Sequence, residues 1–220
     1  MVQSQRTANI GVSGPILDLE KLRSTDRRTQ PFDYVVVSNF IRHEWEDRLM
    51  AAFPRINKGG SFPLSTVKFG TDFSSLIDEM NGAEFRLAVE EKFSTSLEGH
   101  PTMFTVRGRC RRAADGGIHT DSESKIITVL LYMNPRWTNQ GGRLRLLNSG
   151  TSIDNVVEEV PPEVGSLLIF RRCDHSFHGH LPFEGERRVI QMNWVTEHKF
   201  VDREAKRHRW SAFMKGFHFS

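Results

Sequence analysis

From Pro101 onward the chain consists largely of short runs of aliphatic, aromatic and β-branched residues, and this feature most restricts its fold. Turn signals separate the runs, among them Asp115-Gly116-Gly117, Asn139–Gly142 and Pro161-Pro162. Many short strands at such spacing are typical of a β-sandwich or β-barrel. The predicted strands are Met103–Cys110, Lys125–Met133, Arg143–Leu147, Val156–Val160, Ser166–Phe170 and Arg188–Val195.

The segment before Pro101 has a different pattern. Residues 1–31 are polar and predict a loosely held N-terminal extension, whereas Phe32–Val37 predicts a strand. Asn39–Phe53 has apolar residues near helical spacing and precedes Pro54, which predicts a helix that ends there. Residues 72–94 contain further helical patterns. We therefore expect a mainly β protein, with residues 32–220 forming one domain in which an N-terminal helical layer supports a β jelly roll.

Composition excludes several classes of protein. With 38% hydrophobic and 26% charged residues, the chain can build a core and is unlike a disordered protein. No secretory signal is visible, and the longest apolar run, Ile126–Met133, is too short to span a bilayer, so we expect a soluble, cytoplasmic protein. Cys110 and Cys173 are expected to be reduced thiols.

The charge of the chain is mildly basic. The net charge of +3 and the pI of about 9.0 permit an anionic substrate and do not require nucleic acid, so no nucleic-acid partner is expected. Basic residues concentrate between residues 107 and 112 and again in residues 199–215. Residues 202–213 predict a basic helix, whose role the sequence leaves open, as it does the oligomeric state.

Three residues have the chemistry of a metal site. Asp121 follows His119 by two residues, so the two side chains share a face if the segment is extended. A distant histidine could complete one face of a metal, and His178 is followed by an arginine and a tryptophan further along a predicted strand. Two imidazoles and one carboxylate leave metal positions open, which suits non-haem Fe(II) oxygen chemistry. His175 and His180 are rivals to His178.

These motifs, in this order, resemble the Fe(II)/2-oxoglutarate-dependent dioxygenase superfamily, especially its prolyl-4-hydroxylase-like branch. The resemblance covers about residues 101–198 and implies a double-stranded β-helix, a cupin-like jelly roll. It implies that His119, Asp121 and His178 are the iron ligands and the catalytic centre. Gly141-Gly142 matches a glycine turn of the family, to which we assign an architectural role.

The resemblance also implies a cosubstrate site. Arg188 matches the basic residue that pairs with the far carboxylate of 2-oxoglutarate, and a guanidinium suits a carboxylate. Arg188 shares its parity with Ile190, Met192 and Trp194, an apolar face expected to look inward, while Arg187 points to the opposite face. Tyr132 matches the phenol that bonds the same carboxylate.

Arginines before the metal motif are the candidate substrate residues. Arg107 and Arg109 alternate on the segment that leads to His119, so both could face the mouth of the pocket and hold an anionic group. A solvated strand face would give the same alternation. His180 would share a face with His178 in an extended segment, and is a further candidate lining residue.

The implied activity is oxidative decarboxylation of 2-oxoglutarate to succinate, coupled to hydroxylation of an unactivated C–H. The cofactors would be Fe(II), 2-oxoglutarate and O2, with ascorbate a candidate stimulant. We expect a small-molecule substrate that carries an anionic group. The alternatives are a peptidyl prolyl hydroxylase, a non-catalytic jelly-roll binding module, and a different metal enzyme on a cupin-like barrel, for which Glu123 is the only nearby extra ligand.

Overall fold

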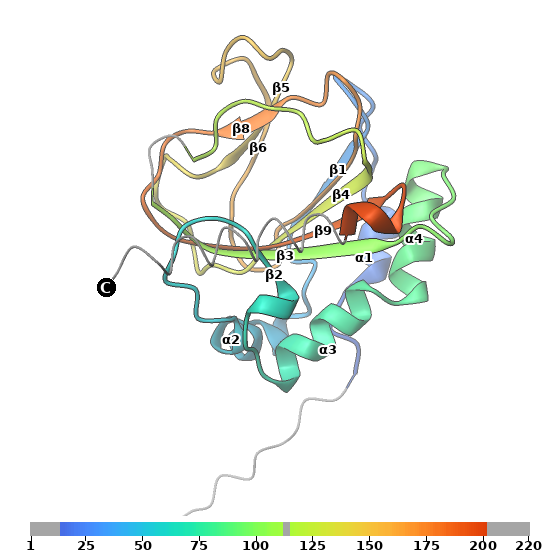
Figure 1. Ribbon diagram of the computed structural model, residues 1–220, viewed down its shortest axis with the longest axis vertical. Helices are drawn as coiled ribbons and strands as arrows, with labels where there is room; N and C mark the ends of the chain where they lie inside the picture. Colours follow the sequence, from blue (N-terminus) through green and yellow to red (C-terminus); the bar gives the residue numbers. More distant parts are fainter. Residues whose placement is uncertain (1–13, 112–114, 202–220) are drawn as a thin grey trace, which may run out of the picture.

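Two antiparallel sheets face one another in the computed structural model, which describes residues 14–111 and 115–201. The larger sheet has the order β1 (Tyr34–Val37), β7 (Leu167–Arg171), β4 (Lys125–Tyr132), β9 (Gly185–Val195), β3 (Thr102–Cys110) and β2 (Phe62–Pro63). The smaller sheet has the order β6 (Val156–Val160), β5 (Leu144–Leu147) and β8 (His178–His180). Most neighbouring strands are far apart in sequence, although β5 and β6 follow one another. Figure 1 shows the smaller sheet above the larger one. The predicted jelly roll is confirmed.

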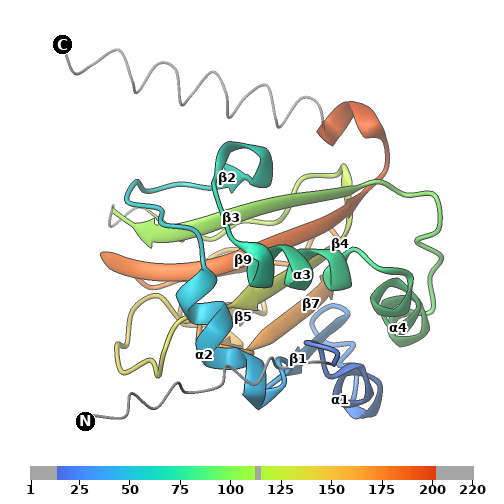
Figure 2. The ribbon, with the colours of Figure 1, turned by 90° about the horizontal axis from the view of Figure 1, so that it is seen from below.

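Helices cover the outer face of the larger sheet. They are α1 (Leu19–Ser24), α2 (His43–Ala52), α3 (Thr71–Met80) and α4 (Ala83–Phe93), with a 3-10 turn at Leu64–Thr66. Figure 2, seen from below, shows α2 and α3 in front of the strands, with α1 and α4 to one side. The larger sheet is therefore covered on both faces, by helices on one side and by the smaller sheet on the other.

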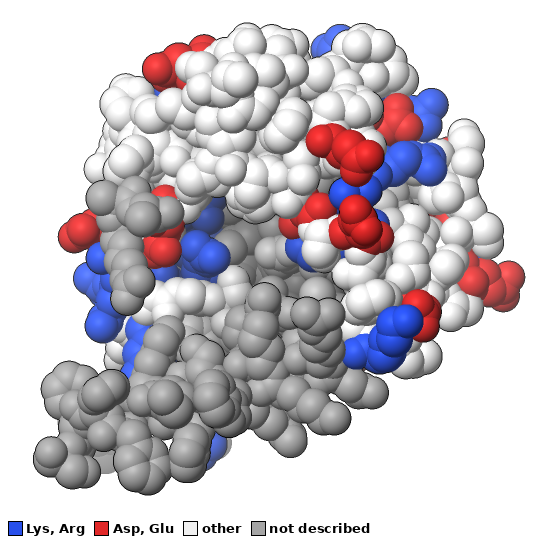
Figure 3. Space-filling view, turned by 45° about the horizontal axis from the view of Figure 1, so that its top comes forward, with Lys and Arg blue, Asp and Glu red and all other residues white. Residues whose placement is uncertain are grey.

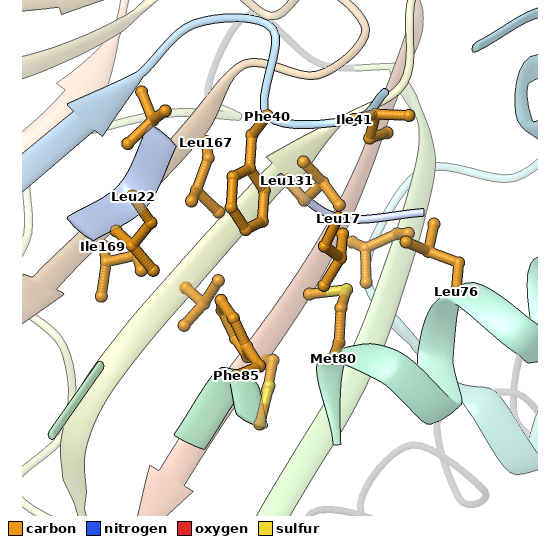
Figure 4. Close-up of a cluster of buried hydrophobic side chains, with 14 of the residues drawn as sticks. Leu17, Leu22, Phe40, Ile41, Leu76, Met80, Phe85, Leu131, Leu167 and Ile169 are labelled. Carbon is orange, nitrogen blue, oxygen red and sulfur yellow. The ribbon is translucent and has the colours of Figure 1, made fainter. Parts of the chain in front are cut away.

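The two faces of the larger sheet belong to two separate cores. One lies between the sheet and the helices and includes Phe85, Met80, Leu131 and Ile169 (Figure 4). Ile190, Met192 and Trp194 of β9 also belong to this core. The other core lies inside the jelly roll, between the two sheets. The larger sheet contributes alternate residues of its strands, which are Tyr34, Leu130, Tyr132, Leu168, Phe170 and Val189, and Phe32, Leu144, Leu146 and Val160 complete this core.

Residues before Phe32 contribute to the folded core, contrary to the expectation of a loosely held extension up to residue 31. Ile16, Leu17 and Leu22 are buried against the helical layer. The backbone N–H groups of Ile16 and Leu17 also donate to the Glu79 carboxylate on α3. Apolar burial together with these hydrogen bonds fixes the segment, so the predicted boundary at residue 32 is too late.

Other predicted elements differ in smaller ways. β8 was not predicted, because its three residues are two histidines and a glycine and have no strand pattern. The basic helix predicted over residues 202–213 lies outside the described residues. Both cysteines are free, as expected. In the described part of the chain, no helix has the length and apolar character needed to cross a membrane.

Candidate metal centre and cosubstrate cavity

Two histidines meet where the segment after residue 115 joins the smaller sheet. His119 and His178 form an isolated antiparallel bridge in which each backbone N–H donates to the other residue's carbonyl, both at 3.0 Å. The bridge places the segment around His119 beside β8, at the edge of the smaller sheet. It also places the two imidazole rings 4.4 Å apart between centroids. Backbone pairing thus brings together two residues that are distant in sequence.

Backbone carbonyls orient both rings. Nδ1 of His119 lies 2.8 Å from the Gly117 carbonyl oxygen, and Nδ1 of His178 lies 2.9 Å from that of Ser176. A carbonyl only accepts, so each Nδ1 donates and each Nε2 keeps its lone pair. Metal-binding histidines commonly have this arrangement, in which the second ring nitrogen is held by a hydrogen bond.

Asp121 supplies a buried carboxylate beside the rings. Its Oδ1 accepts from the Lys125 ammonium at 2.6 Å and its Oδ2 from the Thr128 hydroxyl at 2.5 Å. Asn193 on β9 donates in turn to the Thr128 oxygen at 2.8 Å. Burial alone would raise the pKa of the Asp121 carboxyl, but Lys125, with His178 and Thr128, holds that pKa below its ordinary value. The residue is therefore ionised at neutral pH.

The three side chains suit a divalent metal ion. One ligand atom from each of His119, Asp121 and His178 lies within 4.8 Å of the others, and no other such group of potential ligands occurs among the described residues. The rival His175 is exposed, and His180 is outside the group. Two imidazoles and one carboxylate on one side are the donor set of non-haem Fe(II) centres.

An inner cavity of about 120 Å³ extends from this triad into the jelly roll. Arg187 and Tyr132 line it, and both are buried. The Arg187 guanidinium donates to the Gly142 carbonyl at 2.6 Å and to the Tyr132 hydroxyl at 3.3 Å. Burial raises the pKa of the Tyr132 phenol, so the phenol keeps its proton. Because its oxygen accepts from Arg187, its O–H remains a donor toward a further group.

Arg188 lies on the other face of β9, and the expectation that it faces the cavity is wrong. Its guanidinium donates to the Met50 carbonyl at 2.9 Å and to Glu186 at 2.7 Å, and it lies over the Phe53 ring. Arg188 does share a face of β9 with Ile190, Met192 and Trp194, as predicted. That apolar face packs against the helices and does not line the cavity. The cavity face carries Arg187, Val189 and Gln191.

An outer cavity of about 800 Å³ opens from the triad toward solvent. Arg107 lines both cavities, and its one hydrogen bond within the described residues goes to the Ser61 hydroxyl at 3.3 Å. Arg109 is exposed and lines neither, because a register shift between residues 107 and 109 breaks the alternation. Figure 3 shows a hollowed face with Lys and Arg side chains along one wall and side chains of both signs opposite.

His180 lines the inner cavity next to Arg187, as its parity with His178 suggested. Burial, with the Arg187 charge, lowers the pKa of His180 to about 4. Burial likewise lowers the pKa of His178 to about 4, although Asp121 opposes this. Both imidazoles are therefore neutral at physiological pH, and a neutral imidazole is the form that binds metal.

Sequence reasoning did not find Lys125, Thr128 or Asn193, which surround the Asp121 carboxylate. Lys125 could have been noticed as a cation close in sequence to a candidate ligand. Thr128 and Asn193 come from neighbouring strands, with Thr128 opposite Asn193 in the register of β4 and β9. That proximity depends on strand pairing, which a single sequence does not reveal.

Comparison with known proteins agrees with this geometry. Residues 108–196 match the family model of the 2OG-Fe(II) oxygenase superfamily. Over these residues the chain has the sequence pattern of this superfamily. The matched residues include the triad, Tyr132 and Arg187. Members of this superfamily are oxidoreductases that use Fe(II), 2-oxoglutarate and O2. No curated protein sequence matches the chain.

Solved structures share the fold of this chain. A Pseudomonas putida prolyl-4-hydroxylase is similar, with a TM-score of 0.56 and 19% identity over 86% of this chain and 98% of the other. A prolyl 4-hydroxylase from Phytophthora capsici has a TM-score of 0.56 and 16% identity over 88% and 70% of the two chains. HygX from Streptomyces hygroscopicus, solved with nickel and 2-oxoglutarate bound, has a TM-score of 0.51 and 10% identity over 75% and 82%. The fold is thus that of the prolyl-4-hydroxylase-like branch.

Proposed function

We propose that this oxygenase binds Fe(II) through Nε2 of His119, Nε2 of His178 and the Asp121 carboxylate, and hydroxylates an unactivated C–H of a small substrate with an anionic group. Iron held by these residues would supply O2 activation coupled to the conversion of 2-oxoglutarate to succinate and CO2. The residues fit this role because the two Nε2 lone pairs and an ionised carboxylate converge, with O2 and cosubstrate positions left open.

The observation that carries the proposal is the buried charge of Arg187. The residue is 4% exposed, and no carboxylate among the described residues forms an ion pair with it. A buried charge is costly unless a counter-ion compensates it. The C5 carboxylate of 2-oxoglutarate would supply that counter-ion, accepting from the Arg187 guanidinium and from the Tyr132 O–H. The role expected of Arg188 therefore passes to Arg187.

The chain itself orients and shields the reactants. Leu130, Leu144 and Val189 line the inner cavity beside Arg187 and exclude water from the cosubstrate. Thr128, which is itself held by Asn193, fixes Oδ2 of the Asp121 carboxylate. His180 presents a neutral ring to the same space, its Nδ1 bonded to the Leu181 carbonyl. Pre-organised ligands of this kind spare the site a rearrangement during turnover.

Arg107 supports the choice of a small anionic substrate. It is half-buried at the junction of the two cavities, and only the neutral Ser61 hydroxyl contacts its guanidinium within the described chain. The outer cavity has mostly polar lining residues, with Met103, Val195 and Phe200 as the apolar exceptions. Grooves that bind proline-rich peptides are usually lined by aromatic side chains. Peptidyl proline is the second candidate, because the similar Pseudomonas putida protein is a prolyl-4-hydroxylase.

The test is succinate formation. Purified protein with Fe(II), ascorbate, O2 and 2-oxoglutarate should form succinate slowly without a prime substrate, and His119→Ala should abolish this turnover. His175→Ala is the matched control, since His175 is close in sequence but exposed and outside the triad. Equal background succinate from the wild type and His119→Ala would favour the non-catalytic binding module instead.

A further inference from the structure

The Lys125 ammonium forms a close ion pair with the carboxylate of Asp121, the proposed metal ligand. Its Nζ is 2.6 Å from Asp121 Oδ1, and the side chains of the pair are 13% and 8% exposed. Within the described residues, no other acceptor contacts this ammonium. An ion pair so poorly hydrated is strong compared with a surface pair, because little solvent screens it.

The second oxygen of Asp121 is also engaged. Thr128 donates to Oδ2, and Asn193 fixes the Thr128 hydroxyl through its own donation. The Arg172 guanidinium further holds the Asp121 backbone carbonyl at 3.2 Å. The carboxylate is therefore fixed in place, and any cation that binds it must share it with Lys125 or displace the ammonium.

We propose that Lys125 is a positioning residue that acts as a built-in counter-ion of Asp121 and competes with the divalent metal for that carboxylate. This inference rests on the proposed function of the triad. Lys125 stabilises the folded protein that has not yet bound metal, and it weakens metal binding. It also lines the outer cavity, so a displaced ammonium has space there.

Electrostatics gives the direction of each effect. A divalent ion on Asp121 would stand close to the ammonium, and like charges at such separations repel strongly in a poorly hydrated site. Removing one partner of a buried pair leaves an uncompensated charge, which destabilises the protein until another cation arrives. Loss of the Lys125 charge should therefore lower stability before metal is added and raise metal affinity. If Lys125 had only a structural role, its loss would lower stability without raising the affinity for metal.

The experiment measures Co(II) binding by calorimetry at pH 8 and thermal unfolding with and without Co(II). Lys125→Gln removes the charge but keeps a hydrogen-bond donor, and Lys125→Met removes both. Both should bind Co(II) about tenfold more tightly or better, because one neighbouring charge shifts cation binding by this order. Both should unfold at a lower temperature before Co(II) is added and show a larger rise on adding it.

Two further variants complete the comparison. Lys125→Arg keeps the charge and should restore the wild-type affinity, whereas Lys199→Met removes an exposed lysine that pairs with Glu197 and should change nothing. Unchanged or weaker Co(II) binding in Lys125→Gln, with wild-type binding intact, would overturn the counter-ion role. Absence of Co(II) binding by the wild type would instead overturn the proposed metal centre.

Discussion

Arg187 and Arg188 are adjacent in sequence, but their side chains lie on opposite faces of the same strand and have different roles. They are adjacent on β9, yet Arg187 lines the cavity with Tyr132, and Arg188 contacts Met50 and Glu186 under the helices. The sequence predicted the alternation correctly. It could not show that both faces of the strand are buried, and in a sheet covered on both sides an apolar face need not be the one that faces the ligand.

Arg187→Ala should raise the 2-oxoglutarate concentration needed for half-maximal succinate formation. Loss of a charge-assisted hydrogen bond costs about 1.5–3 kcal/mol, which corresponds to roughly tenfold to a hundredfold in affinity. Arg188→Ala is the matched control and should leave this concentration unchanged. A defect in Arg188→Ala with normal behaviour of Arg187→Ala would return the role to Arg188. The two variants are compared by titrating 2-oxoglutarate at saturating Fe(II).

Protonation of His178 and His180 should make the metal-free protein less stable in acid. Both have a folded-state pKa of about 4, below the ordinary value of 6.5. The unfolded chain then binds more protons, so stability is complete above pH 6.5 and falls as the pH decreases toward 4. The full loss for His178 alone is on the order of 3 kcal/mol.

Urea unfolding at pH 8, 6.5 and 5 checks this pH dependence. His180→Gln removes one of the two titrating groups, so its stability should fall less steeply than that of the wild type. Identical slopes for the two proteins would show that His180 does not contribute.

At the scale of elements, the glycine turn before β5 is fixed by close packing against the turn before β9. A Cβ on Gly141 would lie 2.2 Å from the Pro182 carbonyl oxygen. The Arg187 guanidinium donates to the carbonyl of the next residue, Gly142. This turn therefore also positions Arg187, the residue proposed to bind the cosubstrate. The architectural role predicted for Gly141-Gly142 thus has a direct connection to the cavity.

Gly141→Ala should destabilise the protein by about 2 kcal/mol or more, because backbone atoms must move to accept the methyl group. Gly70→Ala is a control with open space around the added methyl group and should cost well under this. Both free energies of unfolding come from urea titration. Equal, small losses would mean that the turn adapts without strain.

Elements with a strong periodic pattern were predicted well, and those defined by pairing were not. The runs that became β3, β4, β5, β6, β7 and β9 were predicted close to their observed bounds, because buried strands concentrate apolar and β-branched residues. β8 was missed because His178, Gly179 and His180 become a strand only by pairing with β5 and His119. The candidate ligands were nevertheless found, since their residue types carry the chemistry.

At the scale of the whole molecule, the helical layer begins earlier than composition suggested. The polar segment 1–31 contains a few apolar residues, and the buried ones, Ile16, Leu17 and Leu22, lie on the helix-covered core. The segment was predicted to be loosely held because most of its residues are polar, and the few apolar residues change the average composition little. Their burial packs the start of the described chain against the core that includes α3 and α4. These helices support the larger sheet, on which the candidate metal centre and cavity lie.

Leu22→Ala should therefore lower the free energy of unfolding by about 2–5 kcal/mol, as for other fully buried leucines. Leu87→Ala is the control, since the Leu87 side chain is 48% exposed on α4 and its loss should cost far less. Urea unfolding measures both. Similar small losses would place Leu22 outside the cooperative core.

The most direct test of the account is an anaerobic crystal structure with Fe(II) and 2-oxoglutarate, with anomalous scattering recorded at the iron edge. We expect iron on Nε2 of His119, Nε2 of His178 and the Asp121 carboxylate, with the C5 carboxylate of 2-oxoglutarate on Arg187 and Tyr132. Iron bound elsewhere, on His175 or His180 with His178 turned away, or a cosubstrate carboxylate that does not contact Arg187, would contradict it.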